Sequence, residues 1–192
     1  MGVSLVLSHS RAERLARTEQ FPFRLFKRGI WIFSLGMGIT LVTRLLLGDG
    51  FIVFGVLHLI GVSLLLAYPF LRRRRMSAIF GLLFILLGLY LQNLSVGYPW
   101  LLWLGLAPQS FYSLDYFPLF PWFGVVLIGI SFGDLLYSGY RRRIPLPDLT
   151  GSTFVRPLVF LGRRSLALYL LHQPVLIALL HLCNVTVVYL LH

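Results

Sequence analysis

The arginines of this chain gather in short clusters, and each cluster falls between two apolar stretches. The basic clusters are Arg11 to Arg28, Arg72 to Arg75, Arg141 to Arg143, and Arg156 with Arg163 and Arg164. The connections that alternate with these clusters hold no Lys or Arg. Short loops of integral membrane proteins keep their basic residues in the cytoplasm. The alternation therefore predicts a polytopic membrane protein whose basic loops are cytoplasmic.

The composition supports the same class. The chain is 58% hydrophobic and 12% charged, and its mean hydropathy of +0.84 lies outside the range of soluble domains. The net charge of +11 does not indicate a nucleic-acid partner, because the arginines sit in short loops beside apolar spans. Membrane topology and contact with anionic lipid explain them better. The single cysteine, Cys183, excludes an internal disulfide and a cysteine-based metal site, and we expect no metal.

Five stretches are apolar and long enough to approach the roughly 20 residues that a membrane-crossing helix needs. They are Ile30–Leu47, Phe51–Phe70, Met76–Leu94, Pro118–Tyr137 and Ser165–Leu182. Residues 1–8 resemble the last two turns of a further helix, and they lead into a basic segment, 9–28. Gly129 and Gly133 have the spacing of a close helix-packing face. We expect an all-α, polytopic transmembrane bundle with five complete spans and a partial amino-terminal one, forming a single domain over residues 1–192.

His58 is the first candidate for chemistry, because ionisable groups inside membrane helices are expensive and frequently functional. Gly55 and Gly61 lie three residues to either side, and they would let a second helix or a substrate approach the imidazole. A histidine with a near-neutral pKa is suited to general-base catalysis or to carrying an acyl group. The alternative is a histidine hydrogen-bonded across a helix interface. The sequence leaves both open, and we assign His58 as the candidate catalytic residue.

Arg44, Asp49 and Asp115 are candidate substrate-binding residues at the outer face. Arg44 lies about one turn from the outer end of its span, where it could pair with Asp49, orient an anionic group, or extend toward the interface. Asp115 precedes a span that begins near Pro118. It is placed either to cap that helix or to face a substrate at the outer mouth.

Arg163, Arg164 and His172 are candidate cofactor-binding residues of the last span. The two arginines lie at its cytoplasmic end, where guanidinium groups could bind the phosphates of a nucleotide-like donor. Pro174 frees the carbonyl of Leu170, so a structural polar cluster at a kink, with His172 as one member, is the alternative.

Four stretches in order carry a resemblance to a known family. They are Gly2–Leu5, Phe54–His58, Tyr116–Trp122 followed by Gly124 and Gly129, and Leu161–Leu166 with Tyr169–Pro174. This ordered set resembles the bacterial relatives of the heparan-alpha-glucosaminide N-acetyltransferase catalytic domain, within a wider group of multi-span membrane acyltransferases.

The resemblance implies transfer of an acetyl group from cytoplasmic acetyl-CoA, or another acyl-CoA, to an amine or hydroxyl of a sugar outside. The partners it implies are membrane lipid, acyl-CoA and a carbohydrate-like acceptor in a bacterial inner membrane, without nucleic acid; homo-oligomerisation stays open. Family members begin with an additional helix, and the eukaryotic enzymes place the acyl-accepting histidine in that region. We therefore expect a chain that is the carboxy-terminal part of a seven-span domain, whose activity depends on the preceding region. His58 would then be a supporting group.

Two other functions remain open. A small transporter or flippase-like protein would line a pathway with the same polar residues, although the spans lack the half-helix pair that is typical of transporters. A non-catalytic remnant would show neither chemistry nor transport. Acyl-CoA-dependent labelling of an acceptor, compared with movement of an unmodified substrate, distinguishes the three.

Overall fold

The computed structural model of the protein is built from helices. It describes residues 1–47, 50–94, 96–97, 99–108, 111–138, 141–142, 155–172, 175 and 179. The chain divides into two units, Met1–Ile144 and Pro145–His192, and each is described by itself.

The described elements confirm the helical class. The first unit contains α1 (Gly2–Arg14), α2 (Phe21–Leu47), α3 (Val56–Ala67), the short η1 (Tyr68–Phe70), α4 (Arg74–Leu91), η2 (Pro99–Leu104) and α5 (Leu119–Leu136). It also contains a two-residue antiparallel pair, β1 (Tyr137–Ser138) and β2 (Arg141–Arg142). The second unit contains α6 (Val155–Arg163), and residues 165–172 are also helical.

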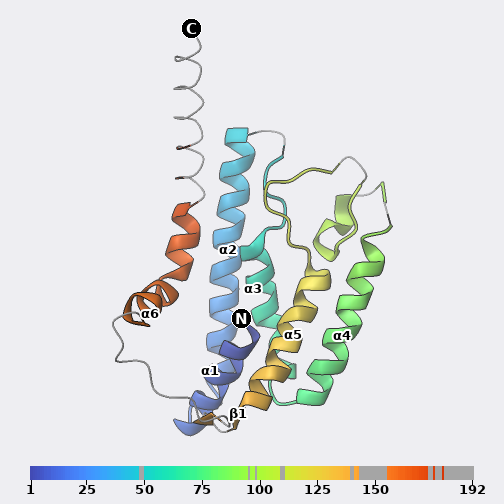
Figure 1. The fold of residues 1–192 in the computed structure, drawn as a ribbon. Helices are drawn as coiled ribbons and strands as arrows, with labels where there is room; N and C mark the ends of the chain where they lie inside the picture. The colour runs from blue at the N-terminus through green and yellow to red at the C-terminus, as the bar shows by residue number, and fades with distance from the viewer. Residues whose placement is uncertain are drawn as a thin grey trace. The chain divides into compact units, whose positions relative to one another are not determined.

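The helices of the first unit lie side by side and run between two chemically different ends (Figure 1). Helix α2 packs on α3, α3 on α5, and α5 on both α4 and α1. We call the end that carries residues 9–28 and 70–75 the basic end. The opposite end, with residues 43–47, 50–56, 99–108 and 111–118, is called the far end. Arginine clusters that are distant in the sequence are thus brought to one end of this unit.

Close backbone contact at glycine holds α5 to its neighbours. A Cβ on Gly133 would lie 2.9 Å from a methyl of Val6, and the nearest atoms to a Cβ on Gly129 belong to the backbone of α1. The predicted packing face of these two glycines is therefore the face that receives α1. On another side of α5, a Cβ on Gly88 would lie 2.5 Å from the backbone nitrogen of Pro121, so α4 also approaches closely.

Within the part of the chain that the structure describes, three helices are long and apolar enough to cross a membrane: Phe21–Leu45, Arg74–Leu91 and Leu119–Leu136. They correspond to three of the predicted spans, so the count of five is not confirmed. The predicted span Phe51–Phe70 is helical only from Val56, and with η1 it forms a shorter apolar helix. Much of the predicted last span lies outside the described residues. Large apolar side chains on α2 and α4 are exposed, as expected of surfaces that face lipid.

Candidate functional site

His58 lies in the first turn of α3 and is buried against α2. The side chain is 2% exposed, and its ring packs edge-on against Phe33 at 5.2 Å and lies 5.4 Å from the ring of Phe54. A Cβ on Gly36 would lie 3.0 Å from two atoms of the imidazole, so the absence of a side chain there makes room for the ring. Gly61 lies against the backbone of Phe33, so the absence of a side chain there lets α2 approach α3. The sequence left open whether a second helix or a substrate would approach, and at Gly61 the neighbour is a helix.

The hydrogen bonds of His58 indicate which nitrogen of its neutral imidazole carries the proton. The Gly55 N–H donates to Nδ1 of His58 over 3.2 Å. A nitrogen that accepts this bond carries no proton, so the neutral ring is assigned the tautomer with its proton on Nε2. Nε2 lies 3.5 Å from Thr40 Oγ1, a long hydrogen bond to α2. His58 therefore closes the first turn of its own helix, as the third residue of a capping box does.

Asp115 caps α3 rather than α5. Its Oδ2 accepts a hydrogen bond from the Val56 N–H over 3.2 Å. The sequence favoured a cap on the helix that begins near Pro118, because that helix is nearer along the chain. The segment before α5 instead runs beside the segment before α3, and the Phe117 N–H donates to the Phe54 carbonyl over 2.9 Å. The Asp115 carboxylate and the His58 imidazole thus accept hydrogen bonds from two consecutive N–H groups at the start of α3, those of Val56 and Gly55.

Arg44 is exposed at the end of α2. Its guanidinium lies over the ring of Phe51, 5.6 Å from the ring centroid. The predicted pairing with Asp49 lies outside the described residues. The connection between α2 and α3 is held by Thr43, whose Oγ1 accepts a hydrogen bond from the Ile52 N–H over 3.2 Å.

Two residues next to His58 were missed by sequence reasoning, which searched only the histidine's own span for partners. Gly36 and Thr40 lie four residues apart on α2 and share one face of that helix. A glycine followed one turn later by a hydroxyl is the signal that could have identified the surface that receives the ring.

Tyr116 is half-buried at the far end. The hydroxyl donates to the Leu102 carbonyl over 2.6 Å, which joins the segment before α5 to η2. Burial raises the pKa of Tyr116 to about 12. The phenol is therefore neutral at ordinary pH and acts as a structural hydrogen-bond donor.

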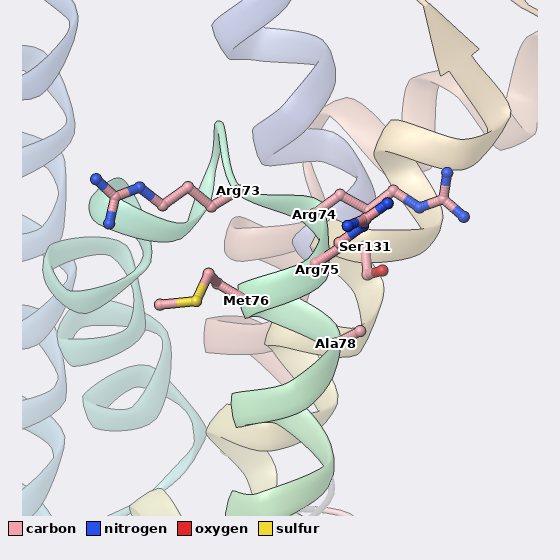
Figure 2. Close-up of a pocket in the computed structure, with 6 residues that line it drawn as sticks. All are labelled: Arg73, Arg74, Arg75, Met76, Ala78 and Ser131. Carbon is pink, nitrogen blue, oxygen red and sulfur yellow. The ribbon is translucent and has the colours of Figure 1, made fainter.

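A basic pocket of about 610 Å³ lies between the start of α4 and α5 at the basic end. It is lined by Arg73, Arg74, Arg75, Met76, Ala78 and Ser131. Figure 2 shows Arg74 and Arg75 extending toward α5 and Ser131, whereas Arg73 extends to the opposite side. The cluster that the sequence assigned to topology therefore also forms a concave surface with the charge to bind anions.

The candidate donor-binding residues belong to the second unit. Arg163 ends α6, and the guanidinium of Arg164 lies 5.0 Å from the ring centroid of Phe160. Nδ1 of His172 lies 2.5 Å from the Tyr169 carbonyl. All three candidates are exposed within their unit, and their role in binding a donor stays a prediction.

Among the residues that the structure describes, no group of three or more His, Cys, Asp or Glu side chains could hold a metal ion.

Comparison with known proteins places the chain in a family. A family model described as heparan-alpha-glucosaminide N-acetyltransferase, catalytic, matches residues 1–174. No curated protein and no solved structure matches the chain. Together with the three described helices that are long and apolar enough to cross a membrane, the match identifies an integral membrane protein of acetyltransferase-like character. The match confirms the predicted resemblance, and the chain belongs to the heparan-alpha-glucosaminide N-acetyltransferase catalytic-domain family.

Proposed function

We propose that the protein transfers an acetyl or other acyl group from acyl-CoA on the side of the basic end to an amine or hydroxyl of a sugar-like acceptor at the far end. The observation that carries this proposal is the family match over residues 1–174. The separation of an arginine-rich end from an end that holds a carboxylate and a histidine supports it.

The orientation we propose follows from the arginines. Because basic loops stay in the cytoplasm, the basic end faces the cytoplasm and the far end faces outward. The protein would then lie in a bacterial inner membrane, with its donor on one side and its acceptor on the other.

The donor carries phosphate groups, which guanidinium groups bind through paired, charge-assisted hydrogen bonds. We assign this binding to Arg163 and Arg164, with His172 nearby in the sequence. Arg74 and Arg75 of the basic pocket are the competing pair in the first unit. The two pairs make opposite predictions, so paired variants can separate them.

At the far end, Asp115 and Asp49 would attract a cationic or hydroxylated acceptor, and Arg44 would orient an anionic group on it. In the reaction, the carbonyl carbon of the acyl group loses its bond to the CoA sulfur and gains a bond to the acceptor nitrogen or oxygen. The acceptor gives up one proton at the far end and the released CoA thiolate takes up one proton at the basic end, so the overall transfer balances.

His58 would contribute to the reaction by holding the start of α3 in place, without itself exchanging a proton with the reactants. Protonation of its Nδ1 would set two donors, Nδ1–H and the Gly55 N–H, against each other, because Nδ1 accepts the bond from Gly55. The geometry therefore supports an imidazole that holds the start of α3, where Asp115 also binds. We propose that His58 is a positioning residue for the acceptor site.

The experiment that tests the function uses the full protein in proteoliposomes, with radiolabelled acetyl-CoA and glucosamine as acceptor. Acetylated glucosamine, formed only with both substrates, is the expected result. Movement of unmodified glucosamine without acetylation would favour a transporter. If neither occurred, acyl transfer by this chain would be refuted.

Variants then test the residue assignments. Arg163→Gln with Arg164→Gln should raise the KM for acetyl-CoA at least about tenfold with kcat retained, since a hydrogen bond to a charged group contributes roughly 1.5–3 kcal/mol. The matched pair, Arg74→Gln with Arg75→Gln, should leave that KM unchanged. The reverse pattern would move the donor site to the basic pocket.

The role of His58 is tested by two substitutions. His58→Gln keeps an acceptor for the Gly55 N–H, as Gln does in a capping box, but it cannot exchange protons as imidazole does. It should retain more activity than His58→Ala. Equal loss in both variants would indicate that the imidazole itself acts on the reactants, and full activity in His58→Ala would remove the residue from the site.

A further inference from the structure

A second basic pocket lies between the end of α1 and the start of α2, and we call it the α1–α2 pocket. Its volume is about 340 Å³. Its charged wall consists of Arg11, Arg17, Arg24 and Arg28, and its apolar wall includes Phe21 and Leu25. Among the described residues, no acidic side chain lines it. The pocket therefore concentrates positive charge that its own walls do not neutralise.

The nearby side chains of Glu13 and Gln20 do not neutralise the positive charge of this pocket. Glu13 of α1 accepts two hydrogen bonds from Arg72, at 2.9 and 3.3 Å from Nη2 and Nε, so its carboxylate is held toward the segment before α4. Arg24 donates to the side-chain oxygen of Gln20 over 2.9 Å, and that amide is neutral. Glu13 is thus already bonded outside the pocket, and Glu19 of the connection between α1 and α2 is exposed and does not line the pocket.

An apolar groove lies beside the α1–α2 pocket, between α2 and the end of α3. Its volume is about 400 Å³. Its walls are formed by Pro22, Phe23, Leu25 and Phe26 of α2 with Leu64, Leu65 and Tyr68. Leu25 lines both cavities, and the ring of Phe21 in the α1–α2 pocket lies 6.5 Å from the ring of Tyr68 in the groove. A charged cavity and an apolar one are thus neighbours on α2.

The length of α2 sets the depth of both cavities in the membrane. Its 27 residues span about 40 Å at roughly 1.5 Å per residue, whereas the hydrocarbon core is about 30 Å thick. About seven residues therefore extend beyond the hydrocarbon. The apolar stretch begins at Ile30, so these seven residues are 21–27, which include Arg24, and Arg28 follows directly. Both arginines then lie at the level of lipid headgroups. Phe23, Leu25 and Phe26 belong to the same segment, so the groove is placed to receive the part of an acyl chain that is nearest to the headgroup.

We propose that the α1–α2 pocket binds the phosphate headgroup of an anionic glycerophospholipid, with an acyl chain of the same lipid in the apolar groove. Guanidinium groups match phosphate oxygens in charge and geometry. The adjoining apolar surface favours a phosphate that carries a hydrocarbon chain over a free phosphate. This lipid site is independent of the acyl-transfer proposal.

The test measures lipid binding to the full protein in a non-ionic detergent by native mass spectrometry. Short-chain phosphatidylglycerol should bind saturably, and phosphatidylcholine with the same chains should bind more weakly. Arg24→Gln with Arg28→Gln should weaken phosphatidylglycerol binding roughly thirtyfold, since each basic residue near an anionic surface contributes about fivefold. Arg73→Gln with Arg75→Gln removes the same charge elsewhere at the basic end and should leave binding unchanged.

Several results would overturn the proposal. Equal weakening in both double variants would show a general charge effect, and equal binding of the two lipids would show that the headgroup charge is not recognised. Displacement by equimolar glycerol phosphate would show an anion site without a role for the acyl chain. Displacement by equimolar coenzyme A would reassign the pocket to the donor.

Two further variants allow the proposal to be tested even if the first double variant does not fold. If Arg24→Gln with Arg28→Gln does not yield a monodisperse protein, Arg17→Gln with Arg28→Gln replaces it, because Arg17 lies in the exposed connection between helices. Phe26→Ser tests the groove, since Phe26 is 53% exposed and its loss leaves the helix interior intact. It should weaken binding of phosphatidylglycerol, and unchanged binding would exclude the groove as the acyl-chain site.

Discussion

Gly36→Ala should destabilise the protein relative to Gly38→Ala on the same helix. A Cβ on Gly36 would lie 3.0 Å from Nδ1 and Cε1 of His58, closer than ordinary van der Waals contact. A Cβ on Gly38 meets no described atom within 4 Å. Each substitution gains about 1 kcal/mol of helix propensity, but only Gly36→Ala adds overpacking, which costs roughly 1–3 kcal/mol. The difference in the free energy of unfolding between the two variants should therefore be about 1–3 kcal/mol.

The assay is thermal unfolding of the two purified variants in the same detergent. For a chain of this size, that difference corresponds to a Tm roughly 2–12 °C lower for Gly36→Ala than for Gly38→Ala. The double variant of Gly36→Ala with His58→Ala should recover part of the loss, because the added methyl then has the space of the missing ring. Equal Tm values for the two single variants would refute the close contact between Gly36 and the imidazole.

Two further predictions concern the far end. Asp115→Ala should lower the free energy of unfolding by about 1 kcal/mol through loss of the α3 cap, and Asp115→Asn, which keeps an acceptor, should lose less in denaturant titration. The pKa of Tyr116, raised to about 12 from its ordinary value of 10.0, means that the folded protein holds this proton after the unfolded chain has lost it. Its stabilising contribution is complete below about pH 10 and is lost as the pH rises toward about 12. The difference in phenolate absorbance between the wild type and Tyr116→Phe should show no ionisation near about pH 10 in the folded state.

Local sequence patterns predicted several elements well. The spans that became α4 and α5 differ from their predicted limits by only a few residues, because a long apolar run determines a membrane helix with little help from distant residues. Gly129 and Gly133 were identified as a packing face from their spacing alone. The start of α3 was predicted too early, at Phe51 instead of Val56, because Phe51 to Phe54 are as apolar as the helix that follows them.

The candidate site depended on contacts that no local pattern contains. Asp115 and Val56 are 59 residues apart, and their hydrogen bond exists because two segments of the far end run together. Thr40 and Gly36 face His58 because α2 and α3 pack face to face. Sequence reasoning could name the histidine and the carboxylate as expensive polar groups, but their partners required the packed helices.

The sequence by itself determined the membrane class, the helical architecture, the family resemblance and the spacing of the arginine clusters. These properties follow from hydropathy, charge and short motifs, which are local to the chain. Only the tertiary structure decided which N–H groups the imidazole and the carboxylate satisfy, and how arginines of separate segments line the α1–α2 pocket. Those outcomes depend on distances between helices, and such distances arise only when the apolar faces and glycines have packed.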